Sequence, residues 1–400
     1  MNLSIMTYAL IIIVKVESIW WQINYKDGIE KVKKMLINQK QNVNKFSEFI
    51  NSDNILRNRI NDFDNIIPTH QLTCKDIGFI GQNHSNLCKQ MNKFPEIIFK
   101  AAHFSLIQCQ NQLKLNPWNC TYALERHNIK FITSSNSPEK AFIYALTAAA
   151  TMYSMTSACS SALISQCGCD ESMKLRNNGI NFQWGSCSDD VNYGERFSTR
   201  ILDTLENPNT QNGLINLWNY KIGREVVKKS IETKCKCYGI SGSCSLKMCH
   251  REMASFTKIA EIIKNKFDLA IRVKKIKKNS LVQISDGAEI NNDKIKYKIP
   301  NDNLVYFNNI NNCAISYMPT DLNLKKSKYR RYALNYVTSA TNRECSLNRT
   351  HSNNCEIICC NKGYRIELIE TTEQYGCHFV WCCRTECLTR KIVNRKAFCN

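Results

Sequence analysis

Apolar residues recur at helical spacing through most of the chain between residues 74 and 266. The clearest segment runs from Ser137 to Cys159, with Ser137 as N-cap, Pro138 at the first helical position and Glu139 in the first turn. The apolar face of this predicted helix consists of Phe142, Leu146, Ala149 and Tyr153. The pattern predicts a long amphipathic helix in this region.

The same segment is apolar enough to raise the alternative of a membrane-spanning helix. A buried core helix fits better because the segment ends at a cysteine and is interrupted by the hydroxyl residues Thr147, Thr151, Ser154, Thr156 and Ser157. Two further helices are predicted, over Leu214 to Ile231 and over Arg251 to Phe267. A cluster of four cysteines between Cys235 and Cys249 therefore lies on a connection between helices.

The pattern changes after the last predicted helix. Residues 268–305 lack cysteine and contain Pro300, which is typical of a linker or hairpin. Residues 306–400 carry ten cysteines, and apolar residues alternate around Tyr364 to Ile369 and Phe379 to Trp381. Such a stretch is typical of a small β module held by disulfides, since it offers little apolar core.

The N-terminal part differs again. Tyr8 to Val14 form a short apolar run that we interpret as a signal peptide over residues 1–18, although no Lys or Arg precedes the run. Residues 19–73 are rich in Asn, Lys and Ile, lack cysteine, and are expected to be a partly disordered extension. The body then divides into a helical domain at 74–267, the linker or hairpin at 268–305 and the cystine-rich domain at 306–400.

The predicted fold class is α+β and disulfide-rich: a mainly α-helical N-terminal domain with cysteine-stapled β-hairpins, followed by a small cystine-rich β-hairpin C-terminal domain. The chain has 22 cysteines, an even number that fits complete pairing. Zinc is the alternative, but close pairs such as Cys167-x-Cys169 and the adjacent Cys359-Cys360 differ from the paired Cys-x-x-Cys spacing of zinc sites. We expect structural disulfides, no metal and no other cofactor.

The net charge indicates which partners the chain meets, and the sequons indicate where it could be glycosylated. A net charge of +20 would suit nucleic acid, but a secreted chain meets sulfated polysaccharide instead, so we expect heparan sulfate proteoglycans and no nucleic acid as partners. The candidate contacts are Lys274 to Lys278 (KKIKK) with Lys294, Lys296 and Lys298. A merely solvated basic surface stays open as an alternative. Candidate glycosylation sites are the sequons at Asn83, Asn119 and Asn348.

The most informative stretch is Cys235 to Cys249, which reads CKCYGISGSCSLKMC. Pairing of Cys237 with Cys244 and of Cys235 with Cys249 would close a hairpin with two nested bridges. Its tip would be Tyr238, Gly239, Ile240, Ser241, Gly242 and Ser243, with glycines that permit tight turns. Taken alone, the stretch could be a plain stapled turn. An echo of the Gly-x-Ser-x-Gly hydrolase elbow fails at its last position, so no catalytic residues are predicted. A second alternative is a matrix protein that binds glycosaminoglycan through its positive charge and carries no attached lipid.

This stretch closely resembles the signature of the Wnt family, and further matches follow in the same order along the chain. They are Cys109 to Cys120 with Trp118-Asn119-Cys120-Thr121, Ala141 to Ala145 (AFIYA), Trp184 to Asp190 (WGSCSDD), Gly223-Arg224, Lys266-Phe267-Asp268, Leu304-Val305-Tyr306, Cys359-Cys360 with Gly363-Tyr364, and Phe379 to Cys383 (FVWCC). The resemblance extends from Cys74 to Cys399 and identifies the chain as a divergent member of that family.

The resemblance implies a secreted developmental signal that carries palmitoleate on Ser243, the serine before the second inner cysteine of the hairpin 235–249. This hairpin would bind the cysteine-rich domain of a Frizzled receptor through residues 238–243. A C-terminal hairpin would add contacts from Phe379, Val380, Trp381, Cys382 and Cys383. The implied partners also include an LDL-receptor-related co-receptor and an acyltransferase and carrier of the secretory pathway. The expected location is the extracellular space and matrix, with attachment to membranes through the lipid.

Family pairing further implies a set of disulfides beyond the hairpin. They are Cys74 with Cys88, Cys109 with Cys120, Cys159 with Cys167, Cys169 with Cys187, Cys313 with Cys360, Cys345 with Cys355, Cys359 with Cys399, Cys377 with Cys387 and the adjacent Cys382 with Cys383. For the last pair, separate partners are the alternative.

The chain departs from the family pattern at several positions. Tyr375 and Arg390 stand where two mutually paired cysteines are usual, so a whole bridge is missing and no thiol is stranded. A looser C-terminal hairpin is therefore expected. Tyr238 replaces a usual His, His250 a usual Trp and Ile222 a usual Ala. These changes leave the acceptor hydroxyl of Ser243 in place.

Overall fold

A computed structural model describes residues 82–91, 93–117, 120, 136–174, 182–276, 280–284, 299–307, 343–348, 351, 354–360, 363–381 and 384–400. The predicted signal peptide and extension, Asn119, Lys277, Lys278, Lys294, Lys296, Lys298, Cys74, Cys313, Cys382 and Cys383 lie outside these residues. The chain divides into two compact units, Met1–Gln112 with Ala123–Ile310 and Leu113–Tyr122 with Asn311–Asn400. Each unit is described by itself.

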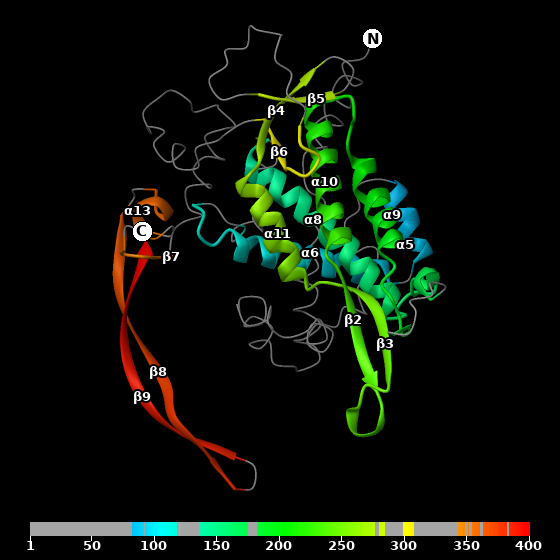
Figure 1. Cartoon of the computed structure of the whole chain (residues 1–400). Helices are drawn as coiled ribbons and strands as arrows, with labels where there is room; N and C mark the ends of the chain where they lie inside the picture. The colour runs from blue at the N-terminus through cyan, green and yellow to red at the C-terminus, as the bar shows by residue number, and fades with distance from the viewer. Residues whose placement is uncertain are drawn as a thin grey trace, which may run out of the picture. The chain divides into compact units, whose positions relative to one another are not determined.

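The first unit is built around helix α8, Pro138–Ser160. As predicted, the Ser137 side chain caps this helix by accepting a hydrogen bond from the Lys140 N–H at 3.3 Å. The helix is buried over nearly its whole length, not only on the predicted face. It packs against helices on several sides: α6 (Phe94–Gln112), α9 (Val191–Leu202), α10 (Gln211–Lys229) and α11 (Phe256–Asp268) (Figure 1). The described residues of this unit also include the short helical elements α5 (Gln82–Gln90), η4 (Glu171–Met173) and η5 (Asp203–Leu205).

Two helices approach α8 so closely that glycine is required at the contact. A Cβ atom at Gly223 of α10 would overlap the Ala145 carbonyl of α8, and one at Gly194 of α9 would overlap the Thr156 side chain. Aromatic rings fill other parts of the same core, with Tyr144 stacked on Tyr220 at 5.1 Å between ring centroids. The segment is thus a buried core helix, and among the described residues no helix is long and apolar enough to cross a membrane.

Two three-stranded sheets belong to the first unit, in the orders β1-β3-β2 and β5-β4-β6. The first consists of β1 (Gln183–Trp184), β2 (Ile231–Tyr238) and β3 (Leu246–Met253), and the second of β4 (Ile271–Ile276), β5 (Ser280–Gln283) and β6 (Val305–Tyr306). The start predicted for the third helix, Arg251, is wrong. Residues 251–253 continue β3, where they pair with residues 231–233 of β2, and the helix begins at Phe256 after the Ser255 cap.

The described residues at the end of the 268–305 range dock on α10. The Asn219 side chain both donates to the Val305 carbonyl and accepts from its N–H, each at 2.9 Å, and the Trp218 ring N–H donates to the Asn303 carbonyl at 2.9 Å. The hairpin part of the prediction is present as β4 and β5.

The described part of the second unit contains β7 (Glu344–Cys345), α13 (Cys355–Ile358), β8 (Tyr364–Val380) and β9 (Arg384–Cys399), with sheet order β7-β9-β8. Strands β8 and β9 form one long antiparallel hairpin, as the alternation predicts in part (Figure 1). Residues 113–117 join this unit, where the half-buried Arg343 guanidinium donates to the carbonyls of Asn116 and Pro117 at 2.6 and 2.8 Å. The small core at the base of the hairpin is rich in cysteine: Cys345, Cys355, Ile358, Cys359, Ala397 and Cys399.

Candidate functional site

The hairpin of β2 and β3 holds the predicted acceptor serine. Cys235 lies directly opposite Cys249 in the ladder, and the two are joined by a disulfide. A second disulfide joins Cys237 to Cys244 and closes the turn. Because one bridge joins the two strands and the other closes the turn beyond them, the tip has little freedom to fray.

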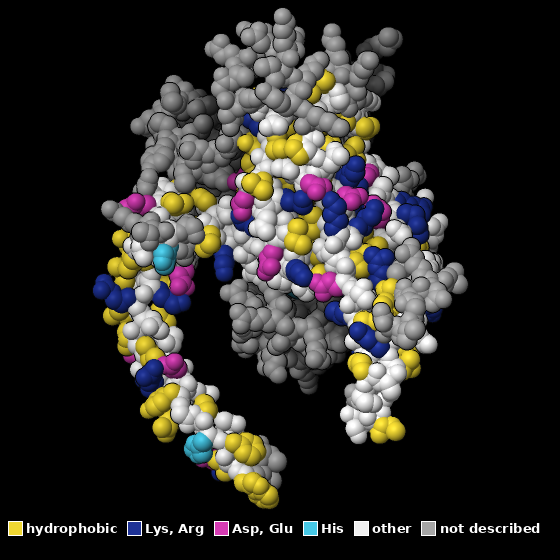
Figure 2. Space-filling model, in the orientation of Figure 1, with side chains coloured by type: hydrophobic (Ala, Val, Ile, Leu, Met, Phe, Trp, Pro, Cys, Tyr) yellow, Lys and Arg dark blue, Asp and Glu magenta, His cyan; other side chains and the backbone are white. Residues whose placement is uncertain are grey.

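The tip itself is fully on the surface. Ser241 and Ser243 are exposed, and Ile240 of the 3-10 turn η6 (Ile240–Gly242) is 91% exposed. Figure 2 shows apolar side chains at the end of this hairpin. The Ser243 N–H donates to the Ile240 carbonyl at 3.2 Å, and the Ser245 hydroxyl donates to the Tyr238 carbonyl at 3.1 Å. These bonds fix the backbone on both sides of the exposed serine.

The glycine argument made from the sequence needs correction at this tip. Gly239 has φ −170°, an extended conformation open to any residue, whereas Ser241 takes the left-handed conformation with φ 56°. Gly239 is needed for space instead, because a Cβ atom there would overlap the hydroxyl and carbonyl of Ser243. The turn therefore folds back on the acceptor serine.

The base of the hairpin is anchored by the segment 183–190, whose role the sequence did not reveal. Strand β1 runs parallel to β3, and the Gly185 N–H donates to the Cys249 carbonyl at 2.9 Å. Further along, the Asp189 N–H donates to the Arg251 carbonyl at 2.9 Å, and the Asp189 carboxylate accepts from the Met253 N–H at 2.8 Å. The segment thus forms a third strand-like support that holds the hairpin against the helices.

Asp189 is the buried one of the two carboxylates in this anchor. Burial raises the pKa of its carboxyl above the ordinary value, and the hydrogen bond from the Met253 N–H opposes that shift. Disulfides Cys159–Cys167 and Cys169–Cys187 tie the same segment to the end of α8. The hairpin base is therefore fixed by both covalent and hydrogen-bonded links.

The second predicted contact lies at the tip of the β8–β9 hairpin. Phe379 is 70% and Trp381 91% exposed, while Val380 is half-buried. Figure 2 shows apolar side chains along this hairpin and at its end. The disulfide Cys377–Cys387 crosses the strands just behind the tip. The arrangement presents aromatic side chains to solvent on a braced support.

A non-covalent contact occupies the position of the missing bridge in this hairpin. The Arg390 guanidinium lies 5.3 Å from the centre of the Tyr375 ring and donates to the Glu373 carboxylate at 2.7 and 2.9 Å. Exposed cation–π contacts and ion pairs contribute about 0.5–1 kcal/mol each, less than a typical disulfide. The sequence contains Tyr and Arg at these two positions, and such residues are suited to a cation–π contact. The contact itself becomes visible only in the structure, where the two residues lie diagonally across the strands.

The remaining predicted disulfides can be compared with the structure. Seven bridges join described cysteines in the pairs that the resemblance implies: Cys159–Cys167, Cys169–Cys187, Cys235–Cys249, Cys237–Cys244, Cys345–Cys355, Cys359–Cys399 and Cys377–Cys387. Four further cysteines, Cys88, Cys109, Cys120 and Cys360, are also disulfide-bonded. Of the sequons, Asn348 lies on an exposed loop, and Asn83 lies in α5.

Comparison with known proteins decides the family. The protein-family model described as "wnt family" matches residues 77–400 of the chain. The chain belongs to the Wnt family. It is 30% identical to Protein Wnt-16 of Bos taurus over 322 residues, which cover 77% of this chain and 82% of the relative. It is 29% identical to Protein Wnt-2b of Homo sapiens over 324 residues, 79% of this chain and 76% of the relative.

Two solved structures are also similar to the chain. One is human WLS in complex with WNT8A, with a TM-score of 0.48 and 25% identity over 77% of this chain and 95% of the other. The other is the N-terminal domain and linker of Drosophila WntD, with a TM-score of 0.37 and 20% identity over 54% of this chain and 95% of the other.

Membership of the Wnt family confirms the predicted family and the disulfide-rich α+β fold with a helical N-terminal part and a C-terminal stapled hairpin. Wnt proteins are signalling ligands and not enzymes, so the hydrolase alternative is excluded. They are typically secreted. The two exposed hairpin tips are accordingly the candidate receptor-binding sites of a signalling ligand.

Proposed function

We propose that this Wnt-family ligand binds the cysteine-rich domain of a Frizzled receptor through a palmitoleoyl group on Ser243 and through its C-terminal hairpin. The observation that carries the proposal is the exposed Ser243 at the end of a hairpin that two disulfides close. An acyltransferase can reach such a serine in the folded chain, and the attached acyl chain then projects away from the helical body.

The energetics favour such a ligand. Burying acyl methylenes in an apolar groove contributes about 0.8 kcal/mol each, so a chain of about a dozen supplies on the order of 10 kcal/mol before ordering costs are subtracted. A rigid tip lowers those costs, because the attachment point is already ordered in the free protein. Ile240 and Tyr238, which are both exposed, are suited to line the edge of the same groove.

The C-terminal hairpin supplies the second contact. Phe379 and Trp381 expose large apolar surface at its tip, and aromatic side chains of this kind often dominate protein interfaces. Cys382 and Cys383 complete the proposed contact. Two separate contact points on one receptor domain would give a specificity that a lipid alone cannot.

Further partners follow from the family. We propose an LDL-receptor-related co-receptor, the acyltransferase and a carrier in the secretory pathway, and heparan sulfate proteoglycans that meet the basic side chains of Lys274 and Lys275. Secretion into the extracellular space and matrix, retention at membranes through the lipid, and glycosylation at sequons such as the exposed Asn348 belong to the same proposal. They describe a short-range developmental signal.

The test compares Ser243 with an exposed side chain of the same hairpin that lies outside the proposed contact residues. Ser243→Ala should abolish binding to the isolated Frizzled cysteine-rich domain and reduce secretion, whereas Lys247→Ala, an exposed position on β3, should leave both within about twofold. Maps of the disulfides in each variant establish that the hairpin is intact. Undiminished receptor binding by Ser243→Ala would refute the proposal.

A further inference from the structure

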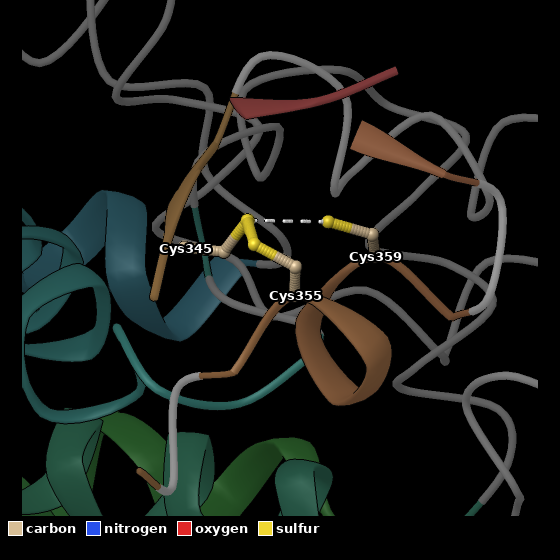
Figure 3. A group of neighbouring side chains, drawn as sticks. All are labelled: Cys345, Cys355 and Cys359. Carbon is tan, nitrogen blue, oxygen red and sulfur yellow. Dashed lines mark hydrogen bonds between the residues drawn. A yellow bond between two sulfur atoms is a disulfide. The ribbon is translucent and has the colours of Figure 1, made fainter. Parts of the chain in front are cut away.

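Two disulfides meet at the base of the C-terminal hairpin. Cys345 of β7 is bonded to Cys355 of α13, and Cys359 is bonded to Cys399 at the end of β9. The Sγ of Cys359 nevertheless lies only 3.6 Å from the Sγ of Cys345, a contact that the dashed line in Figure 3 marks. Sγ atoms of Cys345, Cys355 and Cys359 all lie within 4.8 Å of one another.

Such a group of sulfurs resembles a metal site, but its chemistry here is different. All three sulfurs are already bonded to other sulfurs, so none offers the thiolate that a metal ligand requires. What the group does provide is a second disulfide within reach of any thiolate released from the first. Thiolates exchange with disulfides by direct attack on sulfur, and the rate depends on access to that sulfur.

We propose that these two bridges form a thiol–disulfide exchange site, in which reduction of Cys345–Cys355 by a dithiol reductant is passed on to Cys359–Cys399. The inference goes beyond the proposed receptor binding and does not depend on acylation of Ser243. Its substrate is a small reduced dithiol, because Cys345 and Cys355 are only 5% and 4% exposed and leave little access for the dithiol of another protein.

The chemistry has two balanced steps. In the first, the dithiol gives two electrons and two protons to the Cys345–Cys355 bond, which becomes two thiols while the dithiol becomes a disulfide. In the second, the Cys345 thiolate attacks Sγ of Cys359. The Cys345–Cys359 bond forms, the Cys359–Cys399 bond breaks, and the Cys399 sulfur leaves with the electron pair and takes up the proton that Cys345 released. This second step involves no net oxidation or reduction.

The surroundings make the exchange consequential. Among the described residues, the core at this base has six members, four of which are the bridged cysteines, and Ile358 and Ala397 are the other two. Little apolar packing therefore opposes a rearrangement once one bridge opens. The exchange would release Cys399, and with it the covalent attachment of the end of β9 to the segment that carries α13. One reduction event would loosen the support of the hairpin that presents Phe379 and Trp381.

The experiment uses the full oxidised chain, treated with one equivalent of dithiothreitol in the presence of a metal chelator. Samples are quenched with acid over time, alkylated with N-ethylmaleimide and digested with trypsin together with a protease that cleaves after Glu356, which separates Cys355 from Cys359. Fragmentation then distinguishes Cys359 from Cys360. The expected product is a peptide pair linked through Cys345 and Cys359, with maleimide on Cys355 and Cys399.

The chain supplies its own matched control. The hairpin of β2 and β3 also has two neighbouring bridges, Cys235–Cys249 and Cys237–Cys244, but three sulfurs do not gather there as they do at Cys345, in the part of the chain that the structure describes. It should show only its original pairs or fully alkylated cysteines. Absence of the Cys345–Cys359 peptide at every time point would overturn the proposal.

A variant tests the direction of the exchange. The double substitution Cys345→Ala with Cys355→Ala removes the attacking thiol and keeps Cys359–Cys399. Labelling of Cys399 under the same treatment should then fall at least about tenfold. Equal labelling of Cys399 in this variant would show that its bridge is reduced directly and would also overturn the proposal. Should the variant fail to fold, the linked peptide from the unmodified chain still decides the matter.

Discussion

Gly223→Ala is expected to destabilise the first unit, although alanine is the better helix former. Gly223 is buried in α10, where a Cβ atom would overlap the carbonyl oxygen of Ala145 and lie 2.7 and 2.9 Å from its carbonyl carbon and Cα. These are backbone atoms of α8, so no side chain can rotate away and the helices must separate. Overpacking of this kind costs about 1–3 kcal/mol, occasionally more, against a propensity gain of about 1 kcal/mol. We expect a net loss of about 1 kcal/mol, and up to about 2 kcal/mol if the helices cannot relax.

The assay is denaturant unfolding with the disulfides intact, followed by circular dichroism. Lys221→Ala, an exposed position two residues earlier in the same helix, is the matched control and should stay within about 0.5 kcal/mol of the unmodified protein. Because α10 ends at Lys229 and β2 begins at Ile231, displacement of α10 should also disturb the acceptor hairpin. A Gly223→Ala protein that is about 1 kcal/mol more stable would refute the close approach, since propensity alone gives that result.

Two further predictions concern the hairpin contact and pH. Arg390→Ala should speed amide hydrogen exchange in the β8–β9 hairpin about fivefold, the equivalent of about 1 kcal/mol. Unchanged exchange in Arg390→Ala would contradict the contact. Burial lowers the pKa of His103 from 6.5 to about 3, so its contribution to stability is present above pH 6.5 and is lost as the pH falls toward 3. Between pH 7.5 and pH 5, His103 should therefore lower the free energy of unfolding of the unmodified protein by about 2 kcal/mol. His103→Gln should remove this part of the pH dependence. The same pH dependence in both proteins would argue against a buried neutral imidazole.

The sequence predicted those features that depend on neighbouring residues. Ser137 and Pro138 mark the start of α8 because capping is local, and the cysteine spacing between residues 235 and 249 implies a hairpin because the loop is short. The start of α11 was misplaced because residues 251–253 include a single apolar residue, Met253, which fits the apolar face of either a helix or a strand, and pairing with β2 decides between them.

Features that depend on contacts between distant residues could not be predicted from the sequence. Parallel pairing of β1 with β3 joins segments about 65 residues apart, and no local pattern announces it. The full length of β8 was missed because nearly all of its residues are exposed, so the alternation that marks a half-buried strand is weak. The contact of Arg390 with Tyr375 likewise depends on strand register, which the departures from the family pattern do not specify.

The central claim is that a doubly bridged tip presents Ser243 for acylation, and the mass of one peptide tests it most directly. The peptide that contains residues 235–249 should be isolated, without reduction, from secreted protein that activates a Frizzled-expressing cell. The account predicts two internal disulfides and one palmitoleoyl group on Ser243. Free thiols in that peptide, or an unmodified Ser243 in active protein, would contradict it.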